Sequence, residues 1–512
     1  MKYLYDIVFC NSKDRQELYY KCQSNELVKC NFDGSVFLPI ETSVDLLTYF
    51  NCFSIIKWKQ YTTLKTLAIS GTIKGQAQMT VFSIGKGGKQ LADIHINGDF
   101  VKCFDLVQLS GEILGIKIKA VSDCNIHRIS YSGDFSNWRD LKIGVTICTF
   151  NREEFVTKTI EKLDNFSNVY PWLTVLVVDN GSTLNELESQ NLRIIHNPNY
   201  GGSGGFTRGL IENLRTKQND YVLLMDDDID LDTTSLNHMY GLLCGLKEEY
   251  KESFLSGAML HMNDPCIQHE NTAYWGKIRH HSLGNGWNLT KHDVLLRNES
   301  IKDYDNHYGA WWFCCIPLER AEKIGLPLPL FIKGDDIEYG IRNQRKLIHM
   351  NGIGVWHETL DNKRALWVNY YEYRNFFIIN QYARDCNRWT LFMGICGRLF
   401  EQFIKGWFDH TKILKIAIDD AINGFERITE IPGNVQLDQI RKYNVIENSY
   451  FLSFLLVGFK TLYCLVFYKN INSEYIVFRE TKLKCKDFWL DYLGKAYSAF
   501  NSRDVKNLNK KS

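Results

Sequence analysis

Hydrophobic and polar positions alternate with a period of two over most of the first 135 residues. Runs such as "LAISGTIKGQAQMTVFSIG" and "GIKIKAVSDCNIHRISYSG" are short and are punctuated by Gly, Asn and Asp. Successive side chains of a β-strand point to opposite faces, so this alternation, with turn signals about every eight to twelve residues, is typical of an all-β sandwich or barrel. We therefore predict an N-terminal β-sandwich over residues 1–135.

The pattern changes after the polar stretch "YSGDFSNWRD". The segment "KIGVTICTF" is typical of a short buried strand, "NREEFVTKTIEKLDNF" has the apolar spacing of a helix, and "LTVLVVDNGS" is another near-continuous apolar strand. Buried strands that alternate with helices indicate βαβ units and a mostly parallel sheet. We predict an α/β domain over 136–365, and we expect its ligand-binding residues beyond the carboxyl ends of its strands.

Beyond about residue 365 the pattern becomes helical and rich in aromatic residues, as in "YYEYRNFFIINQYAR". The later run "SYFLSFLLVGFKTLYCLVFYKN" approaches the length of a membrane span, but Lys460 lies near its middle, where a charge in hydrocarbon is costly. We therefore favour a buried or membrane-surface helix over 450–468, flanked by the basic segments "KLKCKDF" and "NLNKKS". The prediction for 366–512 is a C-terminal helical region that can associate with a membrane surface.

Composition sets a few further limits. The 512 residues are 45% hydrophobic and 23% charged, as in an ordinary globular protein, and the formal net charge of +1 gives no general attraction to nucleic acid. The fifteen cysteines include no CxxC pair, and Asp6 and residues 11–15 interrupt any apolar leader near the N-terminus. We therefore expect reduced thiols and a cytoplasmic protein, with at most a peripheral position at the inner membrane face.

The stretch "LLMDDDI" places Asp226, Asp227 and Asp228 directly after an apolar run. Adjacent carboxylates repel one another and raise one another's pKa unless a cation neutralises them. Because strand side chains alternate, we expect Asp226 and Asp228 to face one side, where two carboxylates can hold Mg²⁺ or Mn²⁺. The alternative is a solvated acidic turn that caps the next helix.

The stretch "NPNYGGSGGFTRGL", residues 197–210, lies between the two strand-end motifs "VVDNGS" and "MDDDI". Glycine lets the backbone approach a ligand closely, and the N-terminus of a following helix, together with Arg208, can bind an anion. We interpret this stretch as part of a binding site, with an ordinary flexible loop as the alternative.

A second acidic pair occurs in "PLFIKGDDIEYGIR", residues 329–342. Asp335 and Asp336 follow an apolar run and a glycine, and they open a helix in which Glu338 and Arg342 have i, i+4 spacing. We expect one of the two aspartates to lie in the cleft as a general base. A simple helix cap is the alternative.

His357 follows a short apolar run in "GIGVWHETL". A lone histidine is most often structural, but the carboxylates of Asp226 and Asp228 need further donors if they bind a cation. An imidazole would complete a set of oxygen and nitrogen ligands suited to Mn²⁺. We therefore predict His357 as the third ligand.

Trp311 and Trp312 stand side by side in "GAWWFCCIP". Buried tryptophans are ordinarily part of a core, but an exposed indole face stacks well on the apolar face of a sugar ring. Because adjacent strand residues face opposite ways, we expect one of the two to line the site.

Six motifs occur in a fixed order along the chain: "TICTFNRE", "VVDNGS", "NYGGSGGFTRG", "MDDDI", "KGDDIEYGIR" and "WHE". In these motifs the chain resembles the inverting GT-A glycosyltransferases of family 2. It is particularly similar to the bacterial galactofuranosyltransferases, which carry an N-terminal β-sandwich before the GT-A domain and helices after it. The resemblance implies a Rossmann-like GT-A domain over 136–365, and its motifs lie between about 143 and 360.

The resemblance also implies a role for each matching residue. Asp226, Asp228 and His357 match the metal-binding residues, and Asp336 matches the catalytic base. On the acceptor side the matching residues are Trp311, Trp312, Asp335 and Glu338. The residues expected around the donor are Thr149, Arg152, Asp179, Asn180 and Asn199, with Arg208 and Asp227 beside them. Asn180 stands at a position where members of the family vary.

The function implied by the resemblance is inverting, metal-dependent sugar transfer, foremost of galactofuranose from UDP-galactofuranose. The acceptor would be a glycan or a polyprenyl-linked glycan in cell-surface polysaccharide synthesis, and the cofactor Mn²⁺ or Mg²⁺. Further copies of the chain are a conceivable partner, and nucleic acid is not expected. Two alternatives stay open: a rhamnosyl- or other pyranosyltransferase of the same family, and an inactive carbohydrate-binding protein. The latter has little need for the metal-type residues and Asp336 together.

Overall fold

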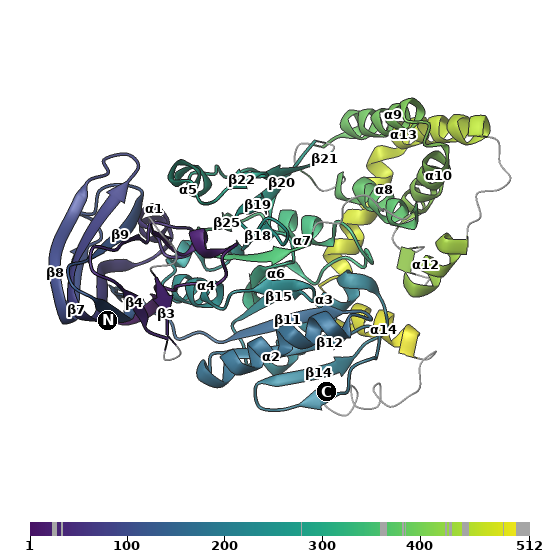
Figure 1. Cartoon of the computed structure of the whole chain (residues 1–512). Helices are drawn as coiled ribbons and strands as arrows, with labels where there is room; N and C mark the ends of the chain where they lie inside the picture. The colour runs from purple at the N-terminus through teal and green to yellow at the C-terminus, as the bar shows by residue number, and fades with distance from the viewer. Residues whose placement is uncertain are drawn as a thin grey trace.

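A computed structural model gives the fold of the 512-residue chain (Figure 1). It describes residues 1–22, 28–31, 34–277, 279–358, 366–380, 383, 386–424, 428–429, 433–442, 450–484 and 486–497. An antiparallel β domain is followed by a mixed α/β domain and then by a helical region, which confirms the predicted fold class. The exact domain boundaries at 135 and 365 stay predictions.

The N-terminal domain is an antiparallel sheet in which strands follow the order β2-β5-β9-β7-β10-β4-β3, with β8 added to β7, β1 to β10 and β6 to β9. The strands are β1 (Lys2–Asp6), β2 (Lys21–Cys22), β3 (Lys29–Cys30), β4 (Val36–Leu38), β5 (Ser43–Asp45), β6 (Phe53–Ser54), β7 (Leu64–Ile84), β8 (Gln90–Asp105), β9 (Ile113–Ala120) and β10 (Cys124–Phe135). The 3-10 turn η1 (Gln16–Leu18) and helix α1 (Ile55–Tyr61) complete the domain.

The long strand β7 joins the two halves of this domain. Its first half pairs with β10 and its second half with β9, and the register shifts between Ile73 and Ala77. Gly75 lies at that shift with φ of 100°, and a Cβ there would lie 2.4 Å from the Asp123 carbonyl oxygen. Glycine is therefore required at this bend, because an L side chain would clash in a conformation it rarely adopts.

The α/β domain is built on a sheet with strand order β13-β14-β12-β11-β15-β24-β17-β25. The strands are β11 (Ile143–Thr149), β12 (Leu173–Asp179), β13 (Leu187–Glu188), β14 (Leu192–His196), β15 (Tyr221–Asp226), β17 (Phe254–Ser256), β24 (Cys314–Pro317) and β25 (Leu347–Ile348). The central strands β14, β12, β11 and β15 are parallel, whereas β24 runs antiparallel to β15. Thr149, Asp179 and Asp226 consequently meet at one edge, as expected for the ligand-binding end of a GT-A-like sheet.

Two smaller sheets extend this domain. One has the order β16-β26-β18-β19-β22 and the other β21-β20-β23. Their strands are β16 (Ile229–Leu231), β18 (Ala258–His261), β19 (Ile267–Glu270), β20 (Thr272–Gly276), β21 (Arg279–Leu283), β22 (Trp287–Asn288), β23 (His307–Tyr308) and β26 (Gly354–His357). Because Ile229 of β16 pairs with His357 of β26, the histidine is brought beside the acidic run that precedes β16.

Helices surround the sheets of this domain, and one approaches the main sheet closely. They are α2 (Glu153–Val169), α3 (Gly201–Thr216), α4 (Thr234–Cys244), α5 (His292–Glu299), α6 (Leu318–Ile324) and α7 (Asp335–Asn343), with the 3-10 turn η3 (Glu248–Tyr250). Helix α3 packs on β11, and Gly205 and Gly209 lie where a Cβ would come within about 2 Å of Cys148 Sγ and Thr146 Cγ2. These glycines allow the close packing of helix and sheet.

The C-terminal region is helical, as predicted. Its described helices are α8 (Leu366–Asn380), α9 (Arg388–Ile404), α10 (Phe408–Ile422), α12 (Gly433–Lys442), α13 (Tyr450–Thr481) and α14 (Lys486–Tyr497). Helix α13 contains the helix expected over 450–468, and no described helix is both long and apolar enough to cross a membrane. The chain then returns to the α/β domain, where the Trp489 indole donates to the Pro327 carbonyl at 3.0 Å. The basic segment "NLNKKS" lies outside the described residues.

The main sheet separates two hydrophobic cores. On β15, Leu223 and Met225 belong to the core shared with the N-terminal β domain, whereas Val222 and Leu224 belong to the core shared with the C-terminal helices. This alternation is the period of a strand buried on both faces. Each flanking region therefore packs against its own face of the main sheet. The described cysteines are all free thiols.

Candidate active and metal-binding site

The acidic run lies at the edge of the main sheet, between β15 and β16. Asp226 ends β15, and Asp227 and Asp228 form a bend before β16 begins at Ile229. The bend turns Asp226 and Asp228 toward the imidazole of His357, whose Nε2 lies 2.9 Å from Asp228 Oδ1 and 3.8 Å from Asp226 Oδ2. One ligand atom from each of the three residues lies within 4.8 Å of the others. The structure thus brings together the three predicted metal ligands.

The electrostatics of this cluster reflect crowded carboxylates. Removal from water raises the pKa of Asp226 to about 7, with the charges of Asp228 and Asp227 adding to the effect and His357 opposing it. Burial opposes the charging of His357, but the hydrogen bond and charge of Asp228 outweigh it and raise the pKa of His357 to about 9. Burial would also raise the pKa of Asp228, yet His357 and Arg152 lower it. Nearby positive charge therefore favours the ionised form of these carboxylates.

The donor set fits a hard or borderline divalent cation. Two carboxylate oxygens and one imidazole nitrogen are typical ligands of Mn²⁺, and Mg²⁺ also accepts carboxylates together with water or phosphate oxygens. The three side chains are only partly exposed, so a cation here could contact both the protein and a ligand in the cleft. Asp226, Asp228 and His357 therefore form a candidate metal site.

Asp227 points away from this group and joins two predicted donor residues. Thr149 Oγ1 donates a hydrogen bond of 2.7 Å to Asp227 Oδ2. Arg152 lies 3.5 Å from Asp227 Oδ1 and forms a second ion pair with Asp228. Burial raises the pKa of Asp227, and the bonds from Thr149 and Arg152 oppose this rise. Thr149 and Arg152 thus line the acidic edge, and Arg152 is half-exposed there.

The loop after β12 holds the next group of predicted donor residues. Asp179 is fully buried, and its carboxylate accepts three backbone N–H bonds of 2.7–2.8 Å from Gly181, Thr183 and Leu184. Asn180 donates to the Gly201 carbonyl at 3.0 Å, so it ties this loop to α3. In this structure Asp179 and Asn180 shape the loop, and their contact with a donor stays a prediction.

The glycine-rich segment differs from its predicted position. Helix α3 begins at Gly201, so most of these glycines form its first turns and do not make a separate loop before it. Asn199 Oδ1 accepts from the Gly201 N–H at 2.9 Å at this helix start. Tight packing on β11 overrides the low helix propensity of glycine.

Arg208 is buried two turns into α3 and does not extend beyond the helix start. Its Nε donates to Glu212 Oε1 at 3.0 Å, an i, i+4 ion pair inside the helix. Glu212 is also approached by Arg193 and Arg215. The contact of Arg208 with a donor anion stays a prediction.

The second acidic pair opens α7 directly after Gly334. Asp335 is buried, and Asp336 is partly exposed and accepts the Ile337 N–H at 2.8 Å. Burial raises the pKa of both carboxyls above the usual range, and the charge of Asp336 raises that of Asp335 further. The charge of Asp336 also adds to the raised pKa of Asp226, as expected for carboxyls near one another.

Glu338, predicted near the acceptor, is fully buried in an ion pair. Arg342 Nη2 donates to Glu338 Oε2 at 2.7 Å, and Arg342 Nη1 donates to the carbonyls of Ile324 and Leu326. This pair joins α7 to the loop after α6. Its acceptor contact stays a prediction.

The two tryptophans differ in exposure, but both lie in a turn before β24 and not in a strand, so the alternation expected of a strand is not the cause. Trp311 is 5% exposed and packs edge-on against Phe206 with ring centroids 5.2 Å apart. Trp312 is partly exposed, its indole N–H donates to the Gly257 carbonyl at 3.0 Å, and its ring lies edge-on to His269. Trp312 is therefore the more accessible indole of the pair.

Glu270 is a neighbour of the site that the sequence did not reveal. It ends β19 with 4% exposure, and burial raises its pKa to about 7, with Asp336 contributing to the rise. A raised carboxyl pKa beside another carboxyl is typical of functional clefts. The only sequence signal was a single Glu in the short run "IQHEN", which no periodicity distinguishes from a surface residue.

The strands that carry Asp228 and His357 are supported by the N-terminal domain. Arg15 forms an ion pair of 2.5 Å with Asp230 of β16, and its guanidinium lies 4.1 Å from the ring centre of Trp356 of β26. The Tyr49 hydroxyl donates to the Ile353 carbonyl at 3.0 Å. The metal side of the site is thus braced from the β domain.

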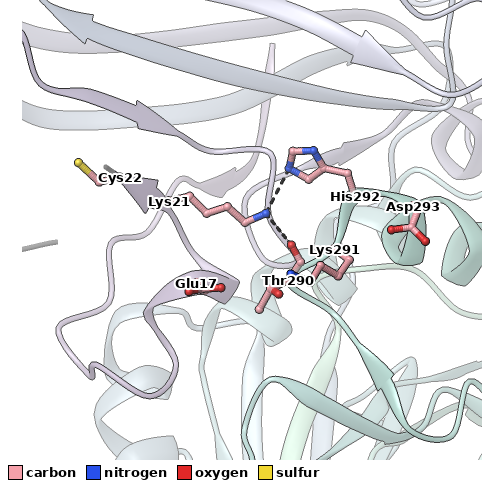
Figure 2. Close-up of a pocket in the computed structure, with 7 residues that line it drawn as sticks. All are labelled: Glu17, Lys21, Cys22, Thr290, Lys291, His292 and Asp293. Atoms are coloured by element: carbon pink, nitrogen blue, oxygen red, sulfur yellow. Dashed lines mark hydrogen bonds between the residues drawn. The ribbon is translucent and has the colours of Figure 1, made fainter. Parts of the chain in front are cut away.

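A pocket of about 480 Å³ lies at the junction of the β domain and α5 (Figure 2). Figure 2 shows the Lys21 ammonium directed at the Thr290 carbonyl, 2.5 Å away, and at His292 Nε2, 3.3 Å away. Its remaining charges are mixed, with Glu17 and Asp293 opposite Lys291. No predicted site residue lines it, so we interpret it as part of the domain junction.

Comparisons with known families match two parts of the chain. Residues 145–248 match the family described as Glycosyl transferase family 2, and residues 9–125 match Galactofuranosyltransferase 2 N-terminal. The first range contains the acidic run and α3, and the second covers most of the β domain.

Similar proteins agree with these matches. The chain is 26% identical over 456 residues to galactofuranosyltransferase GlfT2 of Mycobacterium tuberculosis, covering 80% of this chain and 70% of the relative. It is 24% identical over 378 residues to GlfT2 of Mycolicibacterium smegmatis, covering 66% of this chain and 57% of that relative. A mannosyltransferase from Pyrobaculum calidifontis in complex with GDP-Man and Mn²⁺ aligns over 64% of this chain and 88% of its own, with 12% identity and a TM-score of 0.33.

Proposed function

Because the chain carries a family 2 glycosyltransferase domain and is distantly related to the galactofuranosyltransferases, we propose that it transfers galactofuranose from UDP-galactofuranose to a glycan or polyprenyl-linked glycan. The observation that carries the proposal is the convergence of Asp226, Asp228 and His357 at the sheet edge, where the charge of Asp336 also contributes to the raised pKa of Asp226. An inactive carbohydrate-binding protein has no need of this combination.

The donor side is proposed to use the acidic edge of the sheet. A divalent cation, Mn²⁺ or Mg²⁺, held by Asp226, Asp228 and His357 would act as a Lewis acid that neutralises the diphosphate. Arg152 is half-exposed beside this group and offers a second positive charge to an anionic leaving group. Thr149 and Asp227 hold one another in place behind it.

The reaction we propose is a single displacement with inversion. The acceptor hydroxyl oxygen attacks the anomeric carbon, the bond from that carbon to the diphosphate oxygen breaks, and its electron pair leaves on the diphosphate. Asp336 takes the hydroxyl proton as that bond forms, so charge and atoms balance without a covalent intermediate. A base with a raised pKa suits this role, because it holds the proton more firmly than an ordinary aspartate.

A band of exposed apolar side chains supports an acceptor at a membrane surface. We call it the C-terminal apolar surface, and its members are 40% to 71% exposed. They are Trp389, Met393, Phe400, Phe403, Ile404, Trp407, Leu455, Phe459, Leu462, Tyr463, Val466 and Phe467. They lie on or directly after α9 and on α13, which pack together at one end of the molecule (Figure 1). An exposed patch of this kind marks an interaction site.

Charge favours a lipid surface as the occupant. Arg388, Lys405 and Lys469 flank the apolar side chains, and Glu401 is the one acidic residue within the described segments 388–407 and 455–469. Aromatic side chains with a basic rim and few acids are typical of proteins that dock on anionic membranes. We propose peripheral attachment at the inner membrane face.

Sedimentation with vesicles tests this attachment. We expect the protein to pellet with phosphatidylglycerol vesicles more than with phosphatidylcholine vesicles, and the double variant Phe400→Ser, Phe459→Ser to lose most of this binding. The matched control is Val101→Ser with Val107→Ser, two apolar residues of the β domain that are at least as exposed. Equal binding by both double variants would refute the lipid role, and a change in oligomeric mass by light scattering would identify an interface between copies instead.

A donor panel tests the main proposal. Short galactoside acceptors are incubated with Mn²⁺ and UDP- or dTDP-sugars, including UDP-galactofuranose formed in the assay, and products are weighed by mass spectrometry. We expect an added hexose from UDP-galactofuranose alone, and none after chelation. Transfer from a dTDP-rhamnose or a pyranose donor would replace the sugar assignment and keep the family 2 reaction. If neither donor hydrolysis nor transfer occurs, even when lipid-linked acceptors are supplied, the inactive carbohydrate-binding protein is favoured.

A further inference from the structure

The loop that leads into Asp335 and Asp336 has an unusual backbone. Phe331 has φ of 73°, Lys333 has φ of 65° and Gly334 has φ of 86°. Left-handed conformations are rare for bulky residues, and several within four positions are not maintained by local preference. Contacts from outside the loop must therefore hold its shape, and with it the direction in which Asp336 points.

Some of those contacts come from α3, where the Ser203 N–H donates to the Phe331 carbonyl at 3.1 Å, and others come from α8, about forty residues further along the chain. The two N–H groups of the Asn375 side-chain amide are shared among three loop carbonyls, at 3.2 Å from Leu330, 2.8 Å from Ile332 and 2.6 Å from Lys333. Arg374 Nη2 donates to the same Leu330 carbonyl at 2.7 Å. Both side chains are almost completely buried, at 1% and 0% exposure, so water does not replace these bonds.

Arg374 also fixes the orientation of the Asn375 amide. Its Nε donates to Asn375 Oδ1 at 2.9 Å, so the amide nitrogen must face the loop. Arg374 in turn donates to Gln436 of α12 at 3.0 Å and lies over the rings of Tyr370 and Tyr371. The positions of Arg374 and Asn375 therefore depend on contacts with other residues of the helical region.

Apolar contacts from the same helix close the arrangement. The Tyr371 ring stacks on Phe331 with centroids 5.0 Å apart. Ile379, one turn after Asn375, lies so close to Gly334 that a Cβ there would be 2.6 Å from its Cδ1. Side chains at 371, 375 and 379 have i, i+4 spacing and share one helix face. This face of α8 therefore packs against the 330–334 loop.

We propose that Arg374 and Asn375 are positioning residues that hold the 330–334 loop, and thereby Asp336, in the geometry needed for proton transfer. The inference rests on the proposed function, in which Asp336 is the base. The C-terminal helices would then be part of the catalytic apparatus as well as a docking surface. A small displacement of a base lowers a rate strongly, so loss of this contact should act on kcat.

Asn375→Ala is the direct test, and Asn380→Ala is its matched control. Asn380 is also a buried asparagine of α8, but its amide donates to the Phe376 carbonyl and its oxygen accepts from Trp275, away from the loop. We expect Asn375→Ala to lower kcat by about 10- to 100-fold with little change in the donor KM, and Asn380→Ala to leave kcat within a few-fold of the original protein.

Hydrogen exchange supplies a readout that does not need activity. Backbone amides of 331–337 should exchange faster in Asn375→Ala than in Asn380→Ala, at matched thermal stability. Equal exchange and equal kcat in the two variants would overturn the inference. Asp336→Asn is measured alongside: if that variant remains active, the proposed base is wrong, whereas faster exchange in Asn375→Ala would still establish the contact with the loop.

Discussion

The two halves of the candidate site are built and supported in different ways. The metal half consists of Asp226 at the end of β15, Asp228 in the bend directly before β16, and His357 at the end of β26. The base half consists of Asp335 and Asp336, which follow a loop with left-handed residues. Strand ends are fixed by sheet hydrogen bonds, whereas the loop depends on side chains from another region.

Each half has its own flanking region as a support. Arg15 and Tyr49 of the β domain contact the strands β16 and β26 on the metal side. Arg374 and Asn375 of α8 contact the loop on the base side. The comparison teaches that changes in the β domain should act on metal and donor binding, and changes in α8 on the chemical step.

Asp336→Asn should break the base half most completely. Without a proton acceptor the acceptor hydroxyl is a poor nucleophile, so we expect kcat to fall by about 10²- to 10⁴-fold. Metal affinity should be retained, because Asp226, Asp228 and His357 are unchanged. The measurement is steady-state transfer together with Mn²⁺ titration. A loss of metal binding equal to the loss of rate would show that the two halves are not separate.

His357→Ala should break the metal half. The cluster loses its nitrogen ligand, whose Nε2 lies 2.9 Å from Asp228 Oδ1, so we expect the apparent Mn²⁺ affinity to fall by about 10- to 100-fold. Activity should return in part at high Mn²⁺ concentration. His127→Ala, an exposed histidine of β10, is the control and should leave the titration unchanged. Loss of rate without any shift in the Mn²⁺ dependence would refute the ligand role.

The sequence predicted the regular parts of the fold because their patterns are local. Period-two alternation gave the β domain, and apolar runs such as β11, β12 and β15 gave the α/β sheet, whose strands are buried on both faces. The sheet that contains β16 and β26 was not anticipated, because strands of three or four residues pair across more than a hundred positions. Short apolar runs carry no signal of such pairing.

The structure brings some of the predicted site residues together and places others differently. Asp226 and Asp228 were predicted because they follow an apolar strand, and His357 because their carboxylates would need a further donor to bind a cation. The glycine-rich segment was interpreted as a binding element that precedes a helix, but its packing on β11 makes most of it the start of α3. Asn375 gave no signal in "YYEYRNFF", because a polar residue in an aromatic helix has no period that points to a distant loop.

The pH dependence of the rate should sharpen the view of the base half. Burial raises the pKa of Asp336 above the usual value of about 3.9, and a base acts only when ionised. The rate should therefore fall as pH drops through the raised pKa, by about tenfold per pH unit below it. The measurement is kcat against pH at saturating donor, with circular dichroism to exclude unfolding. An acid limb near pH 4 would contradict a base whose pKa is raised.

Arg15→Gln should give the smallest effect and the most specific one. It removes the ion pair with Asp230 and the contact over Trp356, next to His357, while Asp230 keeps its bond of 2.8 Å from Lys162. Such partly exposed contacts contribute about 0.5–1 kcal/mol each, so the apparent Mn²⁺ affinity should fall only a few-fold with kcat nearly unchanged.

Arg128→Gln is the matched control for Arg15, because Arg128 likewise pairs with a carboxylate, Asp6, and lies over a ring, Tyr3, but inside the β domain. It should leave the Mn²⁺ titration as it was. If Arg15→Gln lowers kcat and spares metal affinity, the β domain does not brace the metal half. If Arg15→Gln changes the Mn²⁺ affinity and Asn375→Ala changes kcat, each flanking region supports one half of a single site.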